Sequence, residues 1–349
     1  MKKRRLRGIQ YFRIGSALIC LMLFLTALCL SRQLSGKLYS QNAAERWQGT
    51  GDLSFAQISA FVRPDTQFTI HELESIHESV NEKLTAASLK AQEHARLWYD
   101  AYSIEAGTAE ITGKRKNPAQ AAVTAVGGDF FRLHAMKFVN GSSFADNDLM
   151  HDRVVIDTLL AWQLFGSSNV TGMEISIDGK NCLIAGVIRP ETDYASEIAY
   201  GEKPRIYISY DFYQNHFPNA DSGNISCYEI VLPNPVRGFA RKILMECLGS
   251  ENEFLFMQNT GRYTLPGRWE TLQGLRKLLI SENISCPYWE NAARIVSFDT
   301  AVLLLAEICF LIWPVIYFIF LLWKIWRLAE EAIADRKRSR KKRYSEMLY

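Results

Sequence analysis

The chain has 349 residues, enough for one large or two modest domains together with membrane segments. Hydrophobic residues make up 48% of it, an ordinary share that excludes a bundle of many membrane helices. The formal net charge is only +3, but basic residues gather at the two ends and acidic residues prevail between them.

Two apolar runs are long enough to enter a membrane. They are Ile14 to Leu30 and Ala301 to Trp323. At 1.5 Å per residue, the second run would reach about 35 Å and span the hydrocarbon core. The first could instead be a signal peptide. We expect a retained anchor, because the apolar stretch would be long for a signal and no small-x-small cleavage site follows in SRQLSGKLY.

The charges that flank these runs predict their orientation, because Lys and Arg beside a span stay in the cytoplasm. The basic residues are Lys2, Lys3, Arg4, Arg5, Arg7 and Arg13 before the first run, and Lys324, Arg327 and a cluster over 336–343 after the second. We therefore expect a two-pass protein of the cell membrane with both termini cytoplasmic. The C-terminal cluster could be a nucleic-acid tail. Because it directly follows a membrane helix, we favour contact with membrane lipid and expect no nucleic-acid partner.

These signals divide the chain into five expected segments. They are a basic cytoplasmic N-terminus (1–13), a transmembrane helix (14–31), an extracytoplasmic domain (32–298), a second transmembrane helix (299–323) and a basic cytoplasmic tail (324–349).

The extracytoplasmic domain begins with a strand, expected over 55–62 and ended by Pro64. Thr69 and Glu72 form a capping-box pattern, which predicts a long helix with an apolar face from Ile70 to Ala87. Further strands are expected over 98–104, 109–112, 121–126, 153–157, 205–209, 228–232 and 253–257.

Turn signals and short helices separate these strands. Gly127-Gly128 is expected to open a short helix and Asn140-Gly141 to make a tight turn. Helices are expected over 158–165 and 239–248, and a hairpin over 173–187 about Asp178-Gly179. The pattern predicts an α+β domain of mixed short strands and helices, in two subdomains, between two transmembrane α-helices.

No group of residues with catalytic spacing stands out. His71 and His77 lie six positions apart, so they would face different sides of a helix, unlike the ligands of a zinc protease. The sequence has no phosphate loop with Gly-Lys-Ser/Thr. We expect no cofactor, no metal site and no enzymatic activity in this chain.

Two features of the sequence leave alternatives open. Cys182, Cys227, Cys247 and Cys286 would lie in an oxidising compartment, where they could form one or two disulfides or remain free thiols. Glu307 lies within the second apolar run, where an acid is costly. It would either contact a partner helix in the membrane or lie near the interface.

The stretch from Thr124 to Pro190 carries a more specific pattern. It contains TAVGGDFFRLHAMKFVNGSSF followed by RVVIDTLLAWQLFG and VTGMEISIDGKNCLIAGVIRP. It resembles the MacB-like periplasmic core domain of FtsX-type ABC transporter permeases. The matching positions include Gly128, Asp129, Phe130, Phe131, Gly141, Phe144, Ala161, Phe165, Gly166, Gly172 and Gly186. On the residues alone these glycines supply turns and the aromatic side chains fill a core.

The resemblance implies mechanical coupling between a cytoplasmic ATPase and the outer domain. The permeases of that family have two further spans, which do not follow here before Tyr349. We therefore expect a permease-like subunit that works with a separate ATPase subunit and an additional permease chain, and whose outer domain binds a partner or substrate. The alternative is a two-span envelope sensor or adaptor without transport activity.

Overall fold

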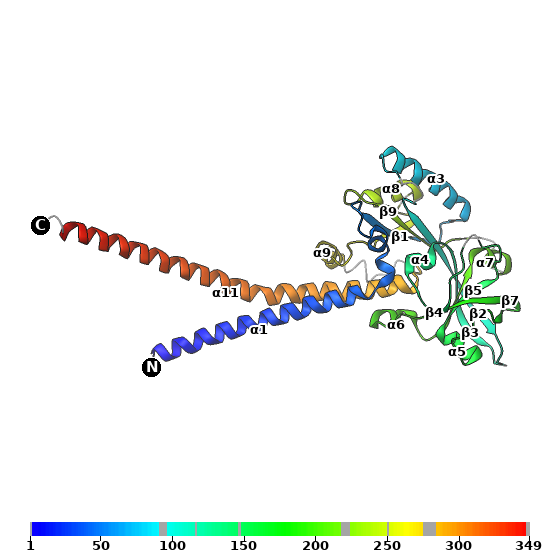
Figure 1. Ribbon diagram of the computed structural model, residues 1–349, viewed down its shortest axis with the longest axis horizontal. Coiled ribbons are helices and arrows are strands. Elements are labelled where there is room, and N and C mark those ends of the chain that lie inside the picture. The colour runs from blue at the N-terminus through cyan, green and yellow to red at the C-terminus, as the bar shows by residue number, and fades with distance from the viewer. Residues whose placement is uncertain are drawn as a thin grey trace. The chain divides into compact units, whose positions relative to one another are not determined.

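The computed structural model describes residues 2–90, 96–115, 117–145, 148–217, 224–249, 251–274 and 284–346. The chain divides into two compact units (Figure 1). One is a helical unit made of residues 1–35 and 299–349, and the other is a globular domain, Gly36–Phe298.

The helical unit contains α1 (Lys2–Gly36) and most of α11 (Tyr288–Glu346). By length and composition, Gln10–Gly36 and Tyr288–Ser339 are long and apolar enough to cross a membrane. The indole nitrogen Nε1 of Trp313 donates to Oγ of Ser16 at 3.0 Å. The small residues Ala17 and Ala27 are buried, as expected where membrane helices approach closely.

The domain alternates short helices and strands. Its helices are η1 (Tyr39–Gln41), α2 (Ala43–Gln48), α3 (Ile70–Ala86), α4 (Phe130–His134), α5 (Thr158–Phe165), α6 (Tyr194–Tyr200), α7 (Tyr210–His216), α8 (Phe239–Leu248) and α9 (Leu265–Gln273). Its strands are β1 (Phe55–Val62), β2 (Tyr99–Thr112), β3 (Ala119–Gly128), β4 (Lys137–Gly141), β5 (Arg153–Asp157), β6 (Glu174–Ile177), β7 (Lys180–Arg189), β8 (Arg205–Ser209), β9 (Cys227–Pro233) and β10 (Phe254–Gln258).

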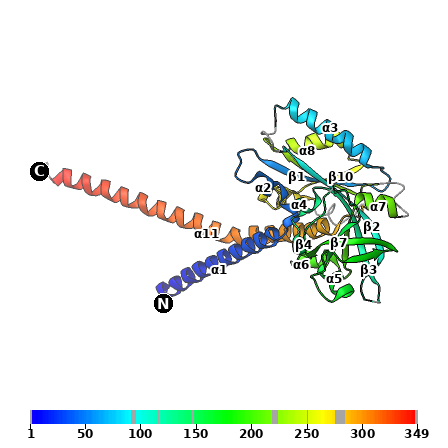
Figure 2. The same cartoon turned by 45° about the vertical axis from the view of Figure 1, so that its right-hand side comes forward.

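The first subdomain is an antiparallel sheet in the order β10-β1-β9-β2. It is built from two β-α-β units, β1-α3-β2 and β9-α8-β10, whose strands interleave. Helices α3 and α8 lie side by side on one face of the sheet (Figure 2). The other face carries α2 and α4 together with buried residues of the first turns of α11, including Trp289.

The second subdomain is a nearly closed ring of strands inserted between β2 and β9. From β2 the sheet continues through β3, β8, β5 and β7, and β6 pairs with both β7 and β2. The pairs β3–β8 and β5–β7 are parallel and the others are antiparallel. Apolar side chains of these strands and of α5 and α7 join the core of the first subdomain in a single cluster.

Local sequence signals explain several of these elements. Thr69 and Glu72 form the expected capping box at the start of α3. Leu73, Ile76, Val80 and Leu84 of that helix are buried at helical spacing against the sheet. The hairpin about Asp178-Gly179 has positive φ at both turn residues, as a two-residue turn requires.

The α+β fold class predicted from the sequence is confirmed, but two local predictions were wrong. The strands expected over 98–104 and 109–112 are one strand, β2, whose pairing with β3 shifts between Glu105 and Thr108. Asn140-Gly141 does not make a tight turn. Both residues pair with β7 as the end of β4, beside an irregularity in the register.

Gly141 is expected to be essential for this strand pairing. Its φ is +67°, and a Cβ there would lie 2.1 Å from the backbone oxygen of Ala185. Substitution Gly141→Ala should destabilise the full-length protein by about 3 kcal/mol or more, combining left-handed strain with a backbone clash. Thermal unfolding in detergent, followed by circular dichroism, measures the effect.

Gly172→Ala is the matched control. Gly172 has a similar φ of +79°, but nothing lies within 4 Å of the added Cβ. Strain alone should cost about 1–2 kcal/mol. Equal losses in the two variants would contradict the role assigned to the close approach of β4 and β7.

Candidate functional site

The residues of the family-like motif position helix α4 against strand β2. Gly128 ends β3 with φ of +64°, and a Cβ there would lie 2.7 Å from the backbone oxygen of Asp100. The next amide, of Asp129, donates to the same oxygen at 2.8 Å. The Asp129 carboxylate pairs with Arg96. Only glycine fits this approach, so the turn fixes where α4 begins.

Both phenylalanines of helix α4 contact Tyr207, and each has a further aromatic neighbour of its own. The ring of Phe130 lies 5.4 Å from that of Trp289, which belongs to the first turn of α11. The ring of Phe131 lies 5.0 Å from Phe144 and 6.2 Å from Tyr207. These edge-on contacts bury large apolar area between α4, the ring of strands and α11.

The remaining motif residues lie in the second subdomain. A Cβ on Gly186 would lie 2.4 Å from the backbone oxygen of Ser142, so Gly186 and Gly141 allow β4 and β7 to meet. Ala161 is buried on α5, and Phe165 packs against the main core. Gly166 ends α5 in the left-handed conformation, and Gly172 precedes β6 with positive φ.

A buried contact between His134 and Glu229 lies beside these aromatic rings. His134 Nε2 is 2.9 Å from Oε2 of Glu229, and both side chains are only 2% exposed. Oε1 of Glu229 accepts a hydrogen bond from Ser59 at 2.7 Å, and Ser59 in turn accepts one from Asn259 at 2.9 Å. The imidazole ring of His134 lies 4.5 Å from Trp289. This polar cluster links α4, β1 and β9 beneath α11.

A buried ion pair holds α11 directly. Glu290 accepts from Nη1 and Nη2 of Arg262 at 2.9 and 3.2 Å, and from Nε of Arg294 at 3.1 Å. Nε of Arg262 donates to Ser297 at 2.7 Å. Burial alone would lower the pKa of Arg262, but Glu290 and its other neighbours outweigh burial and raise it above its usual value.

The two clusters make a rigid joint between the sheet and the first three turns of α11. Arg262 comes from the turn after β10, and Glu290, Arg294 and Ser297 repeat along one side of the helix. Among the residues that the structure describes, no group of three His, Cys, Asp or Glu side chains could hold a metal ion.

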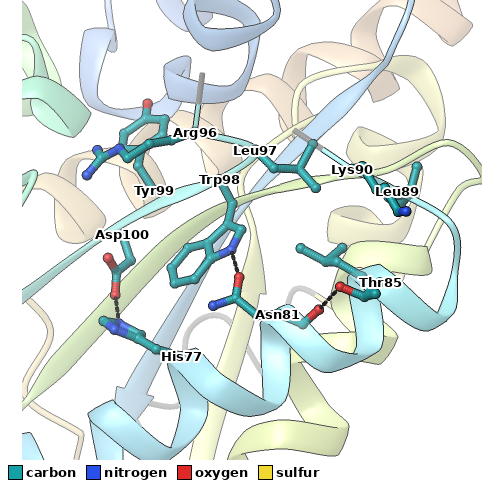
Figure 3. Close-up of a pocket in the computed structure, with 11 residues that line it drawn as sticks. His77, Asn81, Thr85, Leu89, Lys90, Arg96, Leu97, Trp98, Tyr99 and Asp100 are labelled. Carbon is teal, nitrogen blue, oxygen red and sulfur yellow. Dashed lines mark hydrogen bonds and ion pairs between the residues drawn. The ribbon is translucent and has the colours of Figure 1, made fainter. Parts of the chain in front are cut away.

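A groove of about 530 Å³ lies between α3 and the start of β2 (Figure 3). His77 Nε2 contacts Oδ2 of Asp100 at 2.5 Å, and Nε1 of Trp98 donates to Asn81 at 2.8 Å. These polar groups satisfy one another across the groove. Asp100 is also the residue whose backbone oxygen receives the Asp129 amide, so the groove and the motif share one strand.

Cys286 lies beside the charged residues at α11, and Arg294 is one of the neighbours that act on its thiol. All four domain cysteines are free thiols in the structure. Cys227 and Cys286 pack in the same small apolar cluster with Phe61. A disulfide between these two cysteines stays a prediction. Burial raises the pKa of Cys182 to about 12 and that of Cys286 to about 11. Glu307 is buried in α11, and its contact with a partner helix also stays a prediction.

Sequence reasoning missed the four residues that form the two buried polar pairs. His134 lies inside the quoted motif but carried no signal of its own, and Glu229 occupies an otherwise apolar strand, CYEIVLP. The one available hint was Glu290, an acid between Trp289 and two alanines at the start of a helix leading into an apolar span.

Comparisons with known proteins identify relatives of this domain. The profile of the MacB-like periplasmic core domain matches residues 41–237, more than half of the chain. The macrolide export ATP-binding/permease protein MacB of Agrobacterium fabrum is 27% identical over 172 residues, which cover 47% of this chain and 26% of that protein. The chain thus spans about a quarter of the length of this curated relative.

Two solved structures are similar at low sequence identity. The periplasmic region of MacB from Actinobacillus actinomycetemcomitans has a TM-score of 0.42 and 14% identity, covering 64% of this chain and 94% of that one. The extracellular domain of the ABC-type transporter YknZ from Gram-positive bacteria has a TM-score of 0.38 and 14% identity, covering 58% of this chain and 99% of that one.

Breaking the buried pair at α11 should destabilise the domain strongly. Substitution Glu290→Gln leaves Arg262 buried without a counter-charge, which costs about 3–5 kcal/mol in comparable cases. The side chains of Arg262 and Glu290 are 4% and 1% exposed. Chemical denaturation of the full-length protein in detergent measures the loss.

Glu270→Gln is the control. Glu270 pairs with Arg237 at 3.1 Å, but these side chains are 69% and 72% exposed, so water replaces the lost interaction. The midpoint of unfolding should not move. A Glu290→Gln variant that unfolds together with the control would show that the buried pair is not needed to hold α11.

Proposed function

Because the chain belongs to the MacB-like periplasmic core domain family, we propose that it is a membrane-anchored, permease-like subunit of an ABC transporter. Its extracytoplasmic domain binds a partner or substrate and couples to a separate ATPase. The observation that carries this proposal is the family match over residues 41–237, flanked by two helices apolar enough to cross a membrane.

The name of the relative supports a separate ATPase. The Agrobacterium fabrum relative is named as both ATP-binding and permease protein, and this chain matches only part of it. The sequence contains no Gly-Lys-Ser/Thr phosphate loop. In the proposed assembly, a separate ATPase chain supplies hydrolysis and a further permease chain contributes membrane helices.

The joint at α11 supports mechanical coupling. Helix α11 runs without a break from Tyr288, held in the domain by Glu290, to Glu346. A rotation or shift of this helix in the membrane would act on Arg262 and Trp289 and, through them, on the sheet and α4. Rigid helices and buried polar pairs are the physical means by which such movements travel.

The proposed organisation keeps both basic termini in the cytoplasm. It comprises segments 1–13, 14–31, 32–298, 299–323 and 324–349, with the domain outside and the basic tail against anionic lipid. Its support is the position of Lys and Arg beside the two apolar runs.

Purification in mild detergent tests the transporter assignment. A tagged full-length chain should retain an ATPase subunit and a multi-span permease chain, identified by mass spectrometry. An unrelated two-span protein with the same tag, purified from the same membranes, is the control. Recovery of neither protein would favour the alternative function, an envelope sensor or adaptor without transport activity.

Topology is testable with two epitope tags. One is inserted in the exposed turn at Asp178-Gly179 and the other follows Tyr349. In intact spheroplasts the turn tag should be accessible to antibody, while the C-terminal tag should require permeabilisation, because flanking cations do not translocate. The opposite labelling pattern would reverse the proposed orientation.

A further inference from the structure

A pocket of about 310 Å³ in the globular domain is lined by residues from both ends of that domain. Lys37, which lines it, directly follows the last residue of α1, and Tyr288 and Trp289 are the first residues of α11. The end of α4, the start of β4 and the end of β7 complete the wall through His134, Lys137 and Arg189.

Buried polar atoms that line this pocket have no hydrogen-bond partner in the described parts of the chain. They are Nε1 of Trp289, both ring nitrogens of His134 and Oγ of Ser40. The three residues are at most 3% exposed. Because Nε2 of His134 faces Glu229, Nδ1 is the ring nitrogen left for another group. An indole N–H can only donate, so the pocket wall needs an acceptor.

The rim of the pocket is cationic. None of Lys37, Lys137 and Arg189 lies within ion-pair distance of a carboxylate belonging to residues that the structure describes. Lys137 Nζ is held 4.3 Å from the centre of the Tyr39 ring, a cation–π contact that leaves its charge available.

The two acids that line the pocket are already engaged. Glu191 accepts from Oγ of Ser196 at 2.9 Å, and Asp193 caps α6 by accepting from the Ser196 amide at 3.1 Å. Burial, the largest influence, raises the pKa of Glu191, and the nearby Lys137 acts against that shift. The lining therefore favours an anion.

We propose that this pocket binds a phosphate-bearing ligand, with the phosphate held by the cations of the rim and by the indole N–H of Trp289. Met136, Ile188 and Pro190 also line it and would accept an apolar part. Its lining residue Lys37 directly follows α1 in the chain and Trp289 belongs to α11, the two helices that are apolar enough to cross a membrane, so an anionic phospholipid headgroup is the ligand that this chemistry fits best.

The groove beside Trp98 offers no comparable site, because its indole N–H already donates to Asn81 and its imidazole already pairs with Asp100. The phosphate site does not depend on coupling to an ATPase. Failure to recover an ATPase in purification would leave it intact, and loss of ligand binding would leave the transporter assignment intact.

Fluorine NMR on the full-length protein in detergent tests the proposal. Tryptophan is replaced biosynthetically by 5-fluorotryptophan, and the resonance missing from Trp289→Phe is assigned to Trp289. Dihexanoyl phosphatidic acid, dihexanoyl phosphatidylcholine and inorganic phosphate are titrated separately. A saturable shift of the Trp289 resonance with phosphatidic acid alone supports a lipid headgroup. The same shift with inorganic phosphate supports the site with a free phosphate as its ligand.

Two charge-matched variants make the test specific. The triple variant Lys37→Gln, Lys137→Gln, Arg189→Gln should weaken binding at least about tenfold, since hydrogen bonds to charged groups are lost. Lys114→Gln, Lys180→Gln, Lys203→Gln removes the same charge from exposed positions outside the pocket and should bind normally. The basic C-terminal tail is present in both variants, so its own lipid binding cancels.

Isothermal titration calorimetry of the two triple variants repeats the comparison without any change to Trp289. The proposal is overturned by an unshifted Trp289 resonance, by equal binding in the two variants, or by a phosphatidylcholine response equal to that of phosphatidic acid.

Discussion

The buried pair between Arg262 and Glu290 is the constraint on which the joint of this protein depends. Removing two charges from water costs several kcal/mol per ion, and the cost is tolerable only where every polar atom has a partner. Here Glu290 accepts from two arginines, and Arg262 reaches Ser297 as well. Well-packed apolar residues could be equally stable, but they would tolerate more than one rotation of α11. The polar set favours a single rotation, because Glu290 and Ser297 must face Arg262 together.

The family motif positions helix α4 beside this ion pair. Gly128 and Asp129 are not part of the buried polar pairs, yet they determine where α4 begins against the backbone of Asp100. Helix α4 then carries Phe130 and His134 to Trp289, one residue before Glu290. The motif residues Gly128 to Phe131 form a turn and core positions. Through α4, they also position the aromatic contact with the first turn of α11.

Much of the fold could be predicted from the sequence because its signals are local. The capping box of α3 and the hairpin at Asp178-Gly179 depend on residues within a few positions of one another. The continuity of β2 could not be predicted, since Glu105 and Gly107 resemble a break and pairing with β3 carries the strand past it. Gly141 has the positive φ typical of a turn, but it pairs with β7 as the last residue of strand β4. The buried polar pairs join residues far apart in the chain, and nothing near His134 or Arg262 identifies its partner.

The pocket at the joint shares His134 and Trp289 with the contacts that hold α11, and this sharing has a thermodynamic consequence. A ligand that accepts a hydrogen bond from Trp289 interacts with the first turn of α11 and would bind more tightly to one position of that helix than to another. Coupling of this kind is reciprocal. If movement of α11 in the membrane changed the affinity of the pocket by some factor, the ligand would bias the movement by the same factor. The His134–Glu229 pair would keep the opposite wall fixed while this happened, since both of its side chains are buried and Glu229 is also tied to Ser59. The ligand would therefore shift the position of α11 while the sheet stays in place.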